Sequence, residues 1–210
     1  MGELKSINRR TFVKRSAFGA LSIPLISTNP LLVFPPKSIK LTILHTNDMH
    51  SHIDPFSAND SKYPGMGGMR KMASIVEKIR KEEDHVLLLD AGDIFQGTPY
   101  FNKYKGEVEL KIMSEMGYAA STMGNHDFDN GINGFNDVLH YANFPFLCSN
   151  YDFSNTILDG KTKKFIIKNI GELKIGLFGI GIKLNGLVEK RLYKETQYYE
   201  PIEIANHYAE

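Results

Sequence analysis

The chain has 210 residues, of which 42% are hydrophobic, and this is enough apolar material for one well-cored domain. Its formal net charge of +1 provides no global basic field, which argues against a nucleic-acid polymer as the partner. With Cys148 as the only cysteine, an intrachain disulfide and a metal centre built from several thiolates are both excluded.

Residues 1–36 are predicted to be an export signal with a linker. A basic stretch precedes an apolar run over 17–26, which is the layout of a secretory signal and is too short for a stable membrane anchor. The Arg-Arg-x-Phe-x-Lys pattern within residues 9–14 resembles the twin-arginine signal. That resemblance implies export machinery as a partner and a periplasmic or cell-envelope location. No clear Ala-x-Ala cleavage site precedes Lys37, so the position of cleavage stays open.

Residues 37–210 are predicted to form one α/β domain, because strand-like and helix-like segments alternate. In chain order the apolar patterns predict a strand over 41–45, a loop over 59–68, a helix over 69–80, a strand over 86–89, a helix over 107–116, a strand over 119–123, a helix over 132–141, a strand over 144–148, a β-hairpin over 163–179 and a helix over 202–210.

Three of the predicted strands end in polar clusters. Asp48 and His50 follow the first strand, Asp93 follows the second, and Asn125 with His126 follows the strand over 119–123. In α/β sheets the loops after the strand carboxyl ends gather along one edge and form the site. We therefore expect these side chains to converge at one sheet edge.

The chemistry of these residues suits divalent metal ions. Residues i and i+2 of a strand share a side, so Asp48 and His50 can point at one cation. The two oxygens of Asp93 can bridge two cations, and Asn125 offers a neutral oxygen. Two cations about 3.5–4 Å apart can clamp phosphoryl oxygens during in-line displacement. Each motif alone also fits an ordinary loop, since Asp is a common helix cap.

Asp-x-His, Gly-Asp and Gly-Asn-His-Asp, in this order, form the signature of calcineurin-like metallophosphoesterases. The longer segments over 44–50, 90–98 and 124–131 resemble the 5′-nucleotidase branch, and the resemblance covers most of residues 40–210. It implies an α/β/β/α sandwich, incomplete at the C-terminus. It also implies two divalent metal ions, such as zinc or manganese, and a small phosphorylated substrate, a nucleotide.

Carried over residue by residue, the resemblance implies the metal ligands. Asp48 and His50 would bind the first metal, Asp93 would bridge both, and Asn125 would bind the second. The family completes this site with three further histidines, in Ser-His-Leu-Gly-like and Gly-His-x-His segments that do not occur before Glu210. We therefore expect a fragment of a longer protein, without the family's C-terminal substrate-binding domain and with little activity of its own.

The resemblance also implies a catalytic pair. His126 would face the phosphate and stabilise charge on the transition state and the leaving oxygen, and Asp129 would orient the imidazole ring. Other polar residues receive structural interpretations. Asp90 is expected to be a hydrogen-bonding partner at the strand end, His52 to lie outside the ligand set, and His45 to be a core histidine.

The leading functional hypothesis is a metal-dependent phosphoric ester hydrolase similar to the 5′-nucleotidases. It would hydrolyse nucleotides outside the cytoplasm with a hydroxide that bridges the two metals. The alternatives within the superfamily are a cyclic-nucleotide phosphodiesterase, a nucleotide-sugar hydrolase and a thiosulfohydrolase. A non-catalytic exported remnant is the alternative from a different functional class.

Overall fold

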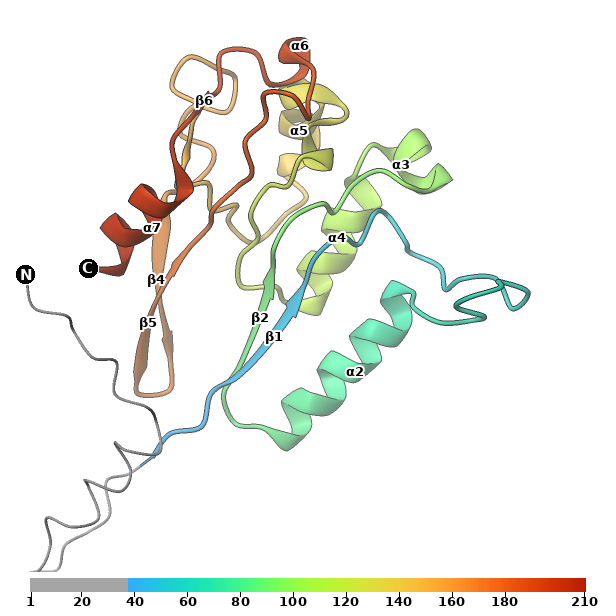
Figure 1. The fold of residues 1–210 in the computed structure, drawn as a ribbon. Helices are drawn as coiled ribbons and strands as arrows, with labels where there is room; N and C mark the ends of the chain where they lie inside the picture. The colour runs from blue at the N-terminus through green and yellow to red at the C-terminus, as the bar shows by residue number, and fades with distance from the viewer. Residues whose placement is uncertain (1–37) are drawn as a thin grey trace, which may run out of the picture. The chain divides into compact units, whose positions relative to one another are not determined.

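The computed structural model of the protein describes residues 38–210 (Figure 1). The export signal and linker predicted over 1–36 lie outside the described residues. Residues 39–210 belong to one unit. Within this described part, every helix falls short of the length and apolar character needed to cross a membrane.

A parallel sheet carries the residues of interest. Its strands β1 (Thr42–Thr46) and β2 (Val86–Asp90) pair in parallel, close to the predicted ranges. The predicted strands over 119–123 and 144–148 continue the sheet only as isolated bridges, Leu89 to Ala120 and Ser121 to Phe146. These two strand predictions are therefore corrected. Pro145 lies within the second of these segments and has no N–H to give to a ladder, which limits the pairing of that segment with the one over 119–123.

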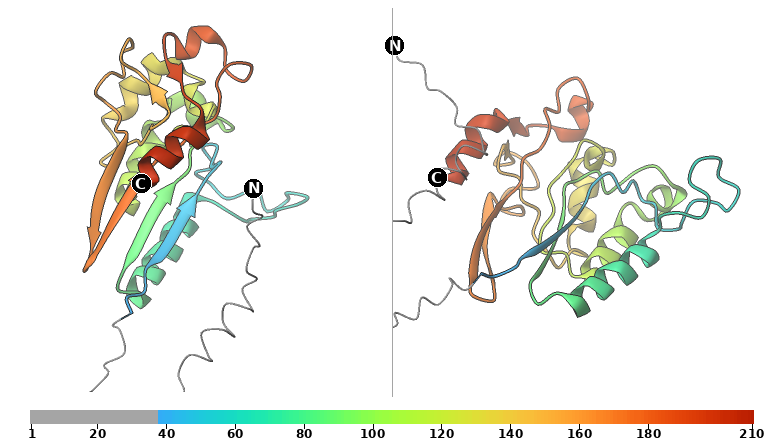
Figure 2. Two further views of the ribbon diagram at one scale, coloured as in Figure 1. Left: turned by 60° about the vertical axis from the view of Figure 1, so that its left-hand side comes forward. Right: turned by 60° about the horizontal axis from the view of Figure 1, so that its bottom comes forward.

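Helices α2 (Met69–Glu82), α4 (Glu107–Met116) and α5 (Gly131–Leu139) contribute to the main core, and α2 and α4 lie on one side of β1 and β2 (Figures 1 and 2). Their apolar faces pack into one cluster that includes Val76, Leu110, Met113, Phe135 and Phe146. The helices agree with the predicted ranges because their apolar spacing is regular.

The first two of these helices are tied together at their ends. Gly117 ends α4 in the left-handed conformation, with φ 71°, and its N–H donates to the carbonyls of the last helical turn. Arg80 of α2 donates to the carbonyl oxygens of Met116 and Gly117, at 2.5 and 2.9 Å. A guanidinium at the carboxyl end of α4 also complements the helix dipole.

The predicted hairpin forms β4 (Phe165–Ile170) and β5 (Leu173–Phe178), which pair antiparallel. One side of it meets the parallel sheet, since Leu177 and Leu89 line the same cavity of about 290 Å³. Helix α7 (Pro201–Ala209) covers the other side, where the Tyr208 ring lies 5.6 Å from that of Phe165. The order helix, sheet, hairpin, helix agrees with the expected α/β/β/α sandwich.

Several short elements were not predicted, because their apolar patterns are too brief to recognise. They are α3 (Pro99–Tyr104), the 3-10 turn η1 (His126–Phe128), α6 (Lys190–Tyr193), and the strand pair β3 (Tyr151–Asp152) and β6 (Gln197–Tyr198). The prediction for His45 is wrong, since this residue is exposed on the edge strand β1 rather than buried in the core.

Candidate metal centre

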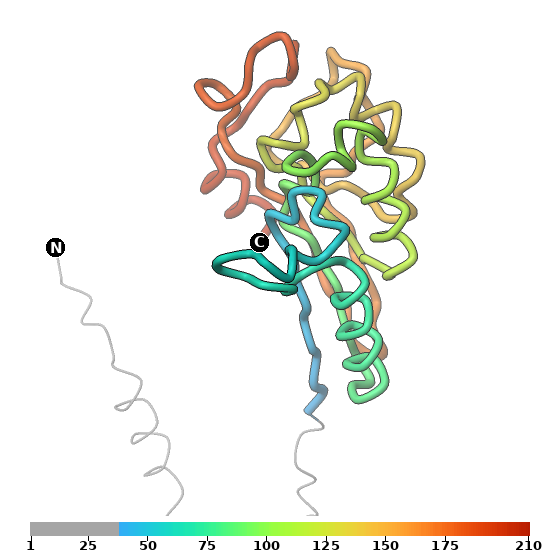
Figure 3. The backbone as a smooth tube through the Cα atoms, turned by 90° about the vertical axis from the view of Figure 1, so that its right-hand side faces the viewer, coloured from blue at the N-terminus to red at the C-terminus, as the bar shows by residue number. Residues whose placement is uncertain are grey.

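The segments that follow β1 and β2 stay paired after the strands end, at the same end of the sheet (Figure 3). The N–H of Asp48 donates to the carbonyl of Gly92 at 3.0 Å, and the N–H of His50 donates to the carbonyl of Asp93 at 3.1 Å. The two predicted motifs are thus fixed to each other through their main chains. These main-chain hydrogen bonds therefore fix the Cα positions from which the side chains of both motifs extend at this edge.

The backbone of these two segments is left-handed at residues where side chains rarely permit it. The positive φ values are 51° at Asp48, 45° at His50, 54° at Ser51, 55° at Asp93 and 70° at Gln96. Such strain gathers at functional sites, where the surrounding structure enforces it. It also corrects the strand argument, because Asp48 and His50 meet through a turn rather than along an extended strand.

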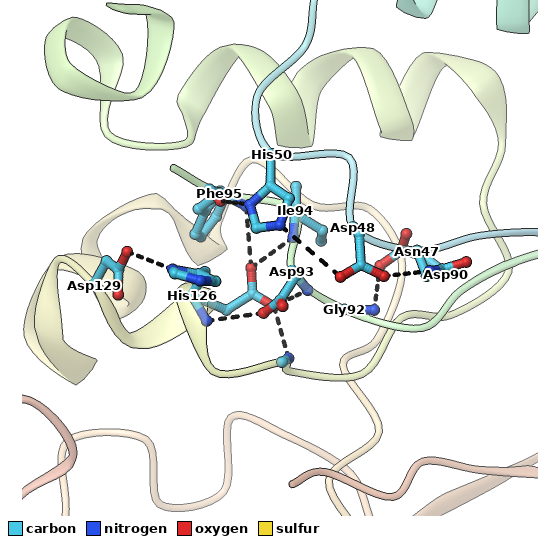
Figure 4. Close-up of polar contacts among 12 residues, drawn as sticks. Asn47, Asp48, His50, Asp90, Gly92, Asp93, Ile94, Phe95, His126 and Asp129 are labelled. Atoms are coloured by element: carbon cyan, nitrogen blue, oxygen red, sulfur yellow. Dashed lines mark hydrogen bonds and ion pairs between the residues drawn. The ribbon is translucent and has the colours of Figure 1, made fainter. Parts of the chain in front are cut away.

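Three side chains form a group with the composition of a metal site. Ligand atoms of His50, Asp93 and His126 lie within 4.8 Å of one another (Figure 4). The Nδ1 of His50 lies 3.2 Å from the carbonyl oxygen of Phe95, so an Nδ1–H donates there and Nε2 remains available. That Nε2 is 3.9 Å from Oδ1 of Asp48, and imidazole nitrogens with carboxylates suit zinc or manganese.

The four predicted metal ligands are not placed equally. Asp48, His50 and Asp93 are brought together, with the Asp48 side chain the most open at 58% exposed. Asn125 opens the 3-10 turn η1, directly before His126, whose N–H donates to Oδ1 of Asp93 at 2.8 Å. Asn125 is therefore a sequence neighbour of the group, and its role as a ligand stays a prediction.

The predicted catalytic pair is in contact. The Nδ1–H of His126 donates to Oδ2 of Asp129 at 2.9 Å (Figure 4). Burial lowers the pKa of His126, but the hydrogen bond and charge of Asp129, with the nearby carboxylates of Asp93 and Asp127, outweigh burial and raise it. The imidazolium form is therefore favoured. Its Nε2 is free to approach a negatively charged group.

Asp127 is a central residue of the site to which the sequence argument gave no role. It is buried, with 1% of its surface exposed, and its carboxylate accepts hydrogen bonds from main-chain amides of both loops. The available signal was the burial implied by an apolar strand running directly into Gly-Asn-His-Asp. Sequence could not name its partners, since Asp93 lies 34 residues earlier in the chain.

Two other polar residues match their structural interpretations. Asp90 accepts hydrogen bonds from the hydroxyls of Thr46 and Ser121, at 2.7 and 2.8 Å, at the end of β2. Burial raises the pKa of Asp90 to about 6, although these hydrogen bonds oppose the shift. His52 packs its ring on Phe56 at 4.7 Å and is not part of the metal-ligand group.

Several known proteins are similar to this chain in sequence and in fold. A snake venom 5′-nucleotidase from Gloydius brevicauda is 40% identical over 153 residues, covering 70% of this chain and 26% of the venom protein. Among solved structures, a 5′-nucleotidase precursor from Thermus thermophilus matches with a TM-score of 0.72 and 30% identity, covering 80% of this chain and 33% of that one. The NAD nucleotidase of Haemophilus influenzae matches with a TM-score of 0.69 and 30% identity, covering 79% and 30%.

The chain thus spans about a quarter to a third of the length of each of these proteins. At the level of the family, the model described as calcineurin-like phosphoesterase matches residues 41–206. This match includes every residue of the group at the sheet edge. Because it also covers well over half of the 210 residues, the chain belongs to the calcineurin-like phosphoesterase family.

Proposed function

We propose that the protein is a metal-dependent phosphoric ester hydrolase that acts on nucleotides outside the cytoplasm. The observation that carries this proposal is the meeting of His50, Asp93 and His126 at one sheet edge, with Asp48 and Asp129 against the two histidines. Ligands for a cation and a charged imidazole both stabilise the negative charge that develops on oxygen during phosphoryl transfer.

Two divalent metal ions are part of this proposal. Asp48, His50 and Asp93 would hold one, and Asp93 with Asn125 would contribute to holding the other. The donor set fits, because imidazole nitrogens and carboxylate oxygens converge without a competing lysine or arginine among the described residues that contact them. When bound, such ions supply an activated water and neutralise charge on the phosphoryl oxygens.

The protein's own residues would orient the reacting groups. Oδ1 of Asp93 accepts a hydrogen bond from the N–H of His126. This contact fixes the orientation of the carboxylate and leaves Oδ2 available to a metal ion. Asp129 holds Nδ1 of His126 and favours the protonated ring. Nε2–H of His126 can then donate to a phosphoryl oxygen or to the leaving oxygen, where negative charge grows in the transition state.

A nucleotide is the proposed substrate because the named relatives are 5′-nucleotidases and an NAD nucleotidase. We further propose that residues 1–36 direct export and that residues 37–210 form the phosphoesterase domain. The Arg9-Arg10 pattern supports export by the twin-arginine route. The venom location in the name of one relative is consistent with action outside the cytoplasm.

The test is an assay of the protein, in the longest form that its gene encodes, against 5′-AMP, a nucleotide sugar, a cyclic nucleotide and a sulfur ester. We expect 5′-AMP to be hydrolysed with added Mn²⁺ and not in EDTA, and we expect Asp93→Asn to remove the activity. If another of these esters is hydrolysed faster than 5′-AMP, the result would favour the corresponding alternative hydrolase over a 5′-nucleotidase. Absence of turnover on all four would favour the non-catalytic alternative.

A further inference from the structure

Asp127 is buried and hydrogen-bonds to both loops that carry the metal-ligand group. Its carboxylate accepts four main-chain N–H groups: those of Asp93 and Gly124 on Oδ2, both at 2.9 Å, and those of Ile94 and Phe95 on Oδ1, at 3.0 and 3.3 Å. We infer that Asp127 is the positioning residue that sets the bridging carboxylate Asp93 against the Asn125–His126 turn. This inference rests on the proposed function.

The contact between the two loops is reciprocal. The N–H of Asp93 donates to the carboxylate of Asp127, while the N–H of His126 donates to the carboxylate of Asp93. Each loop thus contributes one carboxylate that accepts a hydrogen bond and one main-chain N–H that donates a hydrogen bond to the other loop. The exchange fixes both the main chain and the side chain of Asp93. A ligand held at both points is poised for a metal without further ordering.

The loops can come this close because two glycines face each other. A Cβ on Gly92 would collide with the main-chain nitrogen of Gly124, and a Cβ on Gly124 would collide with the Asp93 carboxylate. The two backbones therefore touch directly. With no side chain between them, the Asp127 carboxylate is the group that satisfies the amides on both sides of the contact.

The partners of Asp127 determine which side chain can do this. All four are main-chain N–H groups, which can only donate, so both carboxylate oxygens must accept. In Asp127→Asn the NH₂ group would face at least one pair of N–H donors. Two donors directed at each other cannot bond, and the buried amides would be left unsatisfied.

Asp90 supplies a matched control at the neighbouring strand end. It is also a buried aspartate, but two of its partners are the hydroxyls of Thr46 and Ser121, which can accept as well as donate. In Asp90→Asn the hydroxyls can rotate and accept from the new NH₂. The same chemical change therefore removes the positioning contacts in one variant and keeps most of the hydrogen bonds in the other.

The experiment measures Mn²⁺ affinity of the 210-residue chain by titration calorimetry, for the wild type, Asp127→Asn and Asp90→Asn. We expect Asp127→Asn to bind Mn²⁺ about 10- to 100-fold more weakly, which is typical when a partner that orients a metal ligand is lost. Asp90→Asn should lose clearly less Mn²⁺ affinity than Asp127→Asn. Circular dichroism at the titration temperature establishes that each variant is folded, so that a loss of affinity is not a loss of fold.

If Asp127→Asn does not fold, amide hydrogen exchange of the metal-free wild type, followed by NMR, tests the inference without the variant. We expect protected amides at Asp93, Ile94 and Gly124, and rapid exchange at any of them would overturn the inference. Equal Mn²⁺ affinity of folded Asp127→Asn and wild type would also overturn it. If Mn²⁺ binding depends on Asp127 but the longest form that the gene encodes hydrolyses no nucleotide, the proposed function alone is refuted.

Discussion

At the scale of single residues, the two histidines of the group are held by different partners and are suited to different tasks. The Nδ1–H of His50 donates to a neutral carbonyl, that of Phe95, which leaves Nε2 available to bind a metal. The Nδ1–H of His126 donates to the carboxylate of Asp129, which favours the imidazolium. The partner of Nδ1 therefore distinguishes a ligand from a proton donor.

The first prediction concerns the charge of His126. The structure raises its pKa chiefly through Asp129, against the effect of burial, so Asp129→Asn should lower it in the metal-free chain. NMR titration of the imidazole carbons in EDTA measures this pKa directly. With Asp129 replaced, the largest raising contribution is lost while burial and the smaller contributions of Asp93 and Asp127 remain, so the pKa of His126 should fall below the wild-type value. Identical titration curves would contradict the assigned pairing.

The second prediction concerns Asp90, whose pKa rises from 3.8 to about 6 in the folded protein, mainly through burial. A carboxyl that holds its proton more tightly when folded stabilises the fold below pH 4 and loses that contribution as the pH rises through about 6. Between pH 4 and 7 the wild type should therefore lose on the order of 2 kcal/mol of unfolding free energy that Asp90→Asn does not lose. Urea unfolding of both proteins in EDTA measures the difference, and parallel profiles would contradict it.

At the scale of elements, the regular parts of the fold were predictable and the edge geometry was not. The helix over 107–116 and the hairpin around Gly171 follow from spacing within their own sequences. The segments over 119–123 and 144–148 form only bridges, and Pro145 within the second segment has no N–H to donate to a neighbouring strand.

The candidate site divides in the same way. Its ligand types were readable because Asp-x-His and Gly-Asp end strands, so their convergence followed from the parallel sheet. The sequence did not predict the left-handed turn at Asp48 and His50 or the amide contacts of Asp127. Both depend on contacts between loops that are distant in sequence, and a local sequence pattern does not predict such contacts.

The third prediction tests the direct contact of the two loops. Gly92, with φ 96°, has no room for a Cβ because the main chain of Gly124 occupies it. Gly186 has nearly the same φ, 93°, but nothing within 4 Å of the Cβ position. Gly186→Ala should cost about 1 kcal/mol of stability from backbone strain alone, and Gly92→Ala about 1–3 kcal/mol more from overpacking. Denaturant unfolding compares them, and equal losses would show that the loops do not touch.

At the scale of the whole molecule, one α/β/β/α unit over residues 39–210 presents the ligand group at the carboxyl edge of its parallel sheet. Family membership accounts for this architecture, since solved structures of 5′-nucleotidases share it. The N-terminal residues 1–36 contribute a separate property, a proposed route out of the cytoplasm, which depends on their sequence alone.

The fourth prediction tests that route. Arg9→Lys with Arg10→Lys keeps both positive charges but removes the guanidinium pair, so the double variant should accumulate in the cytoplasm. Arg15→Lys makes the same chemical change outside the pair and should be exported normally. Immunoblots of periplasmic and cytoplasmic fractions read the result. Normal export of the double variant would indicate a general secretory signal.

The central claim is that the group around Asp93 is a metal site, and zinc anomalous diffraction from crystals of the chain tests it most directly. We predict an anomalous peak with an Asp93 carboxylate oxygen and a His50 ring nitrogen at roughly 2.0–2.2 Å. Crystals of Asp93→Asn should lose the peak or show it much weakened. A zinc ion bound elsewhere in the wild type, with no peak between Asp93 and His50, would contradict the account.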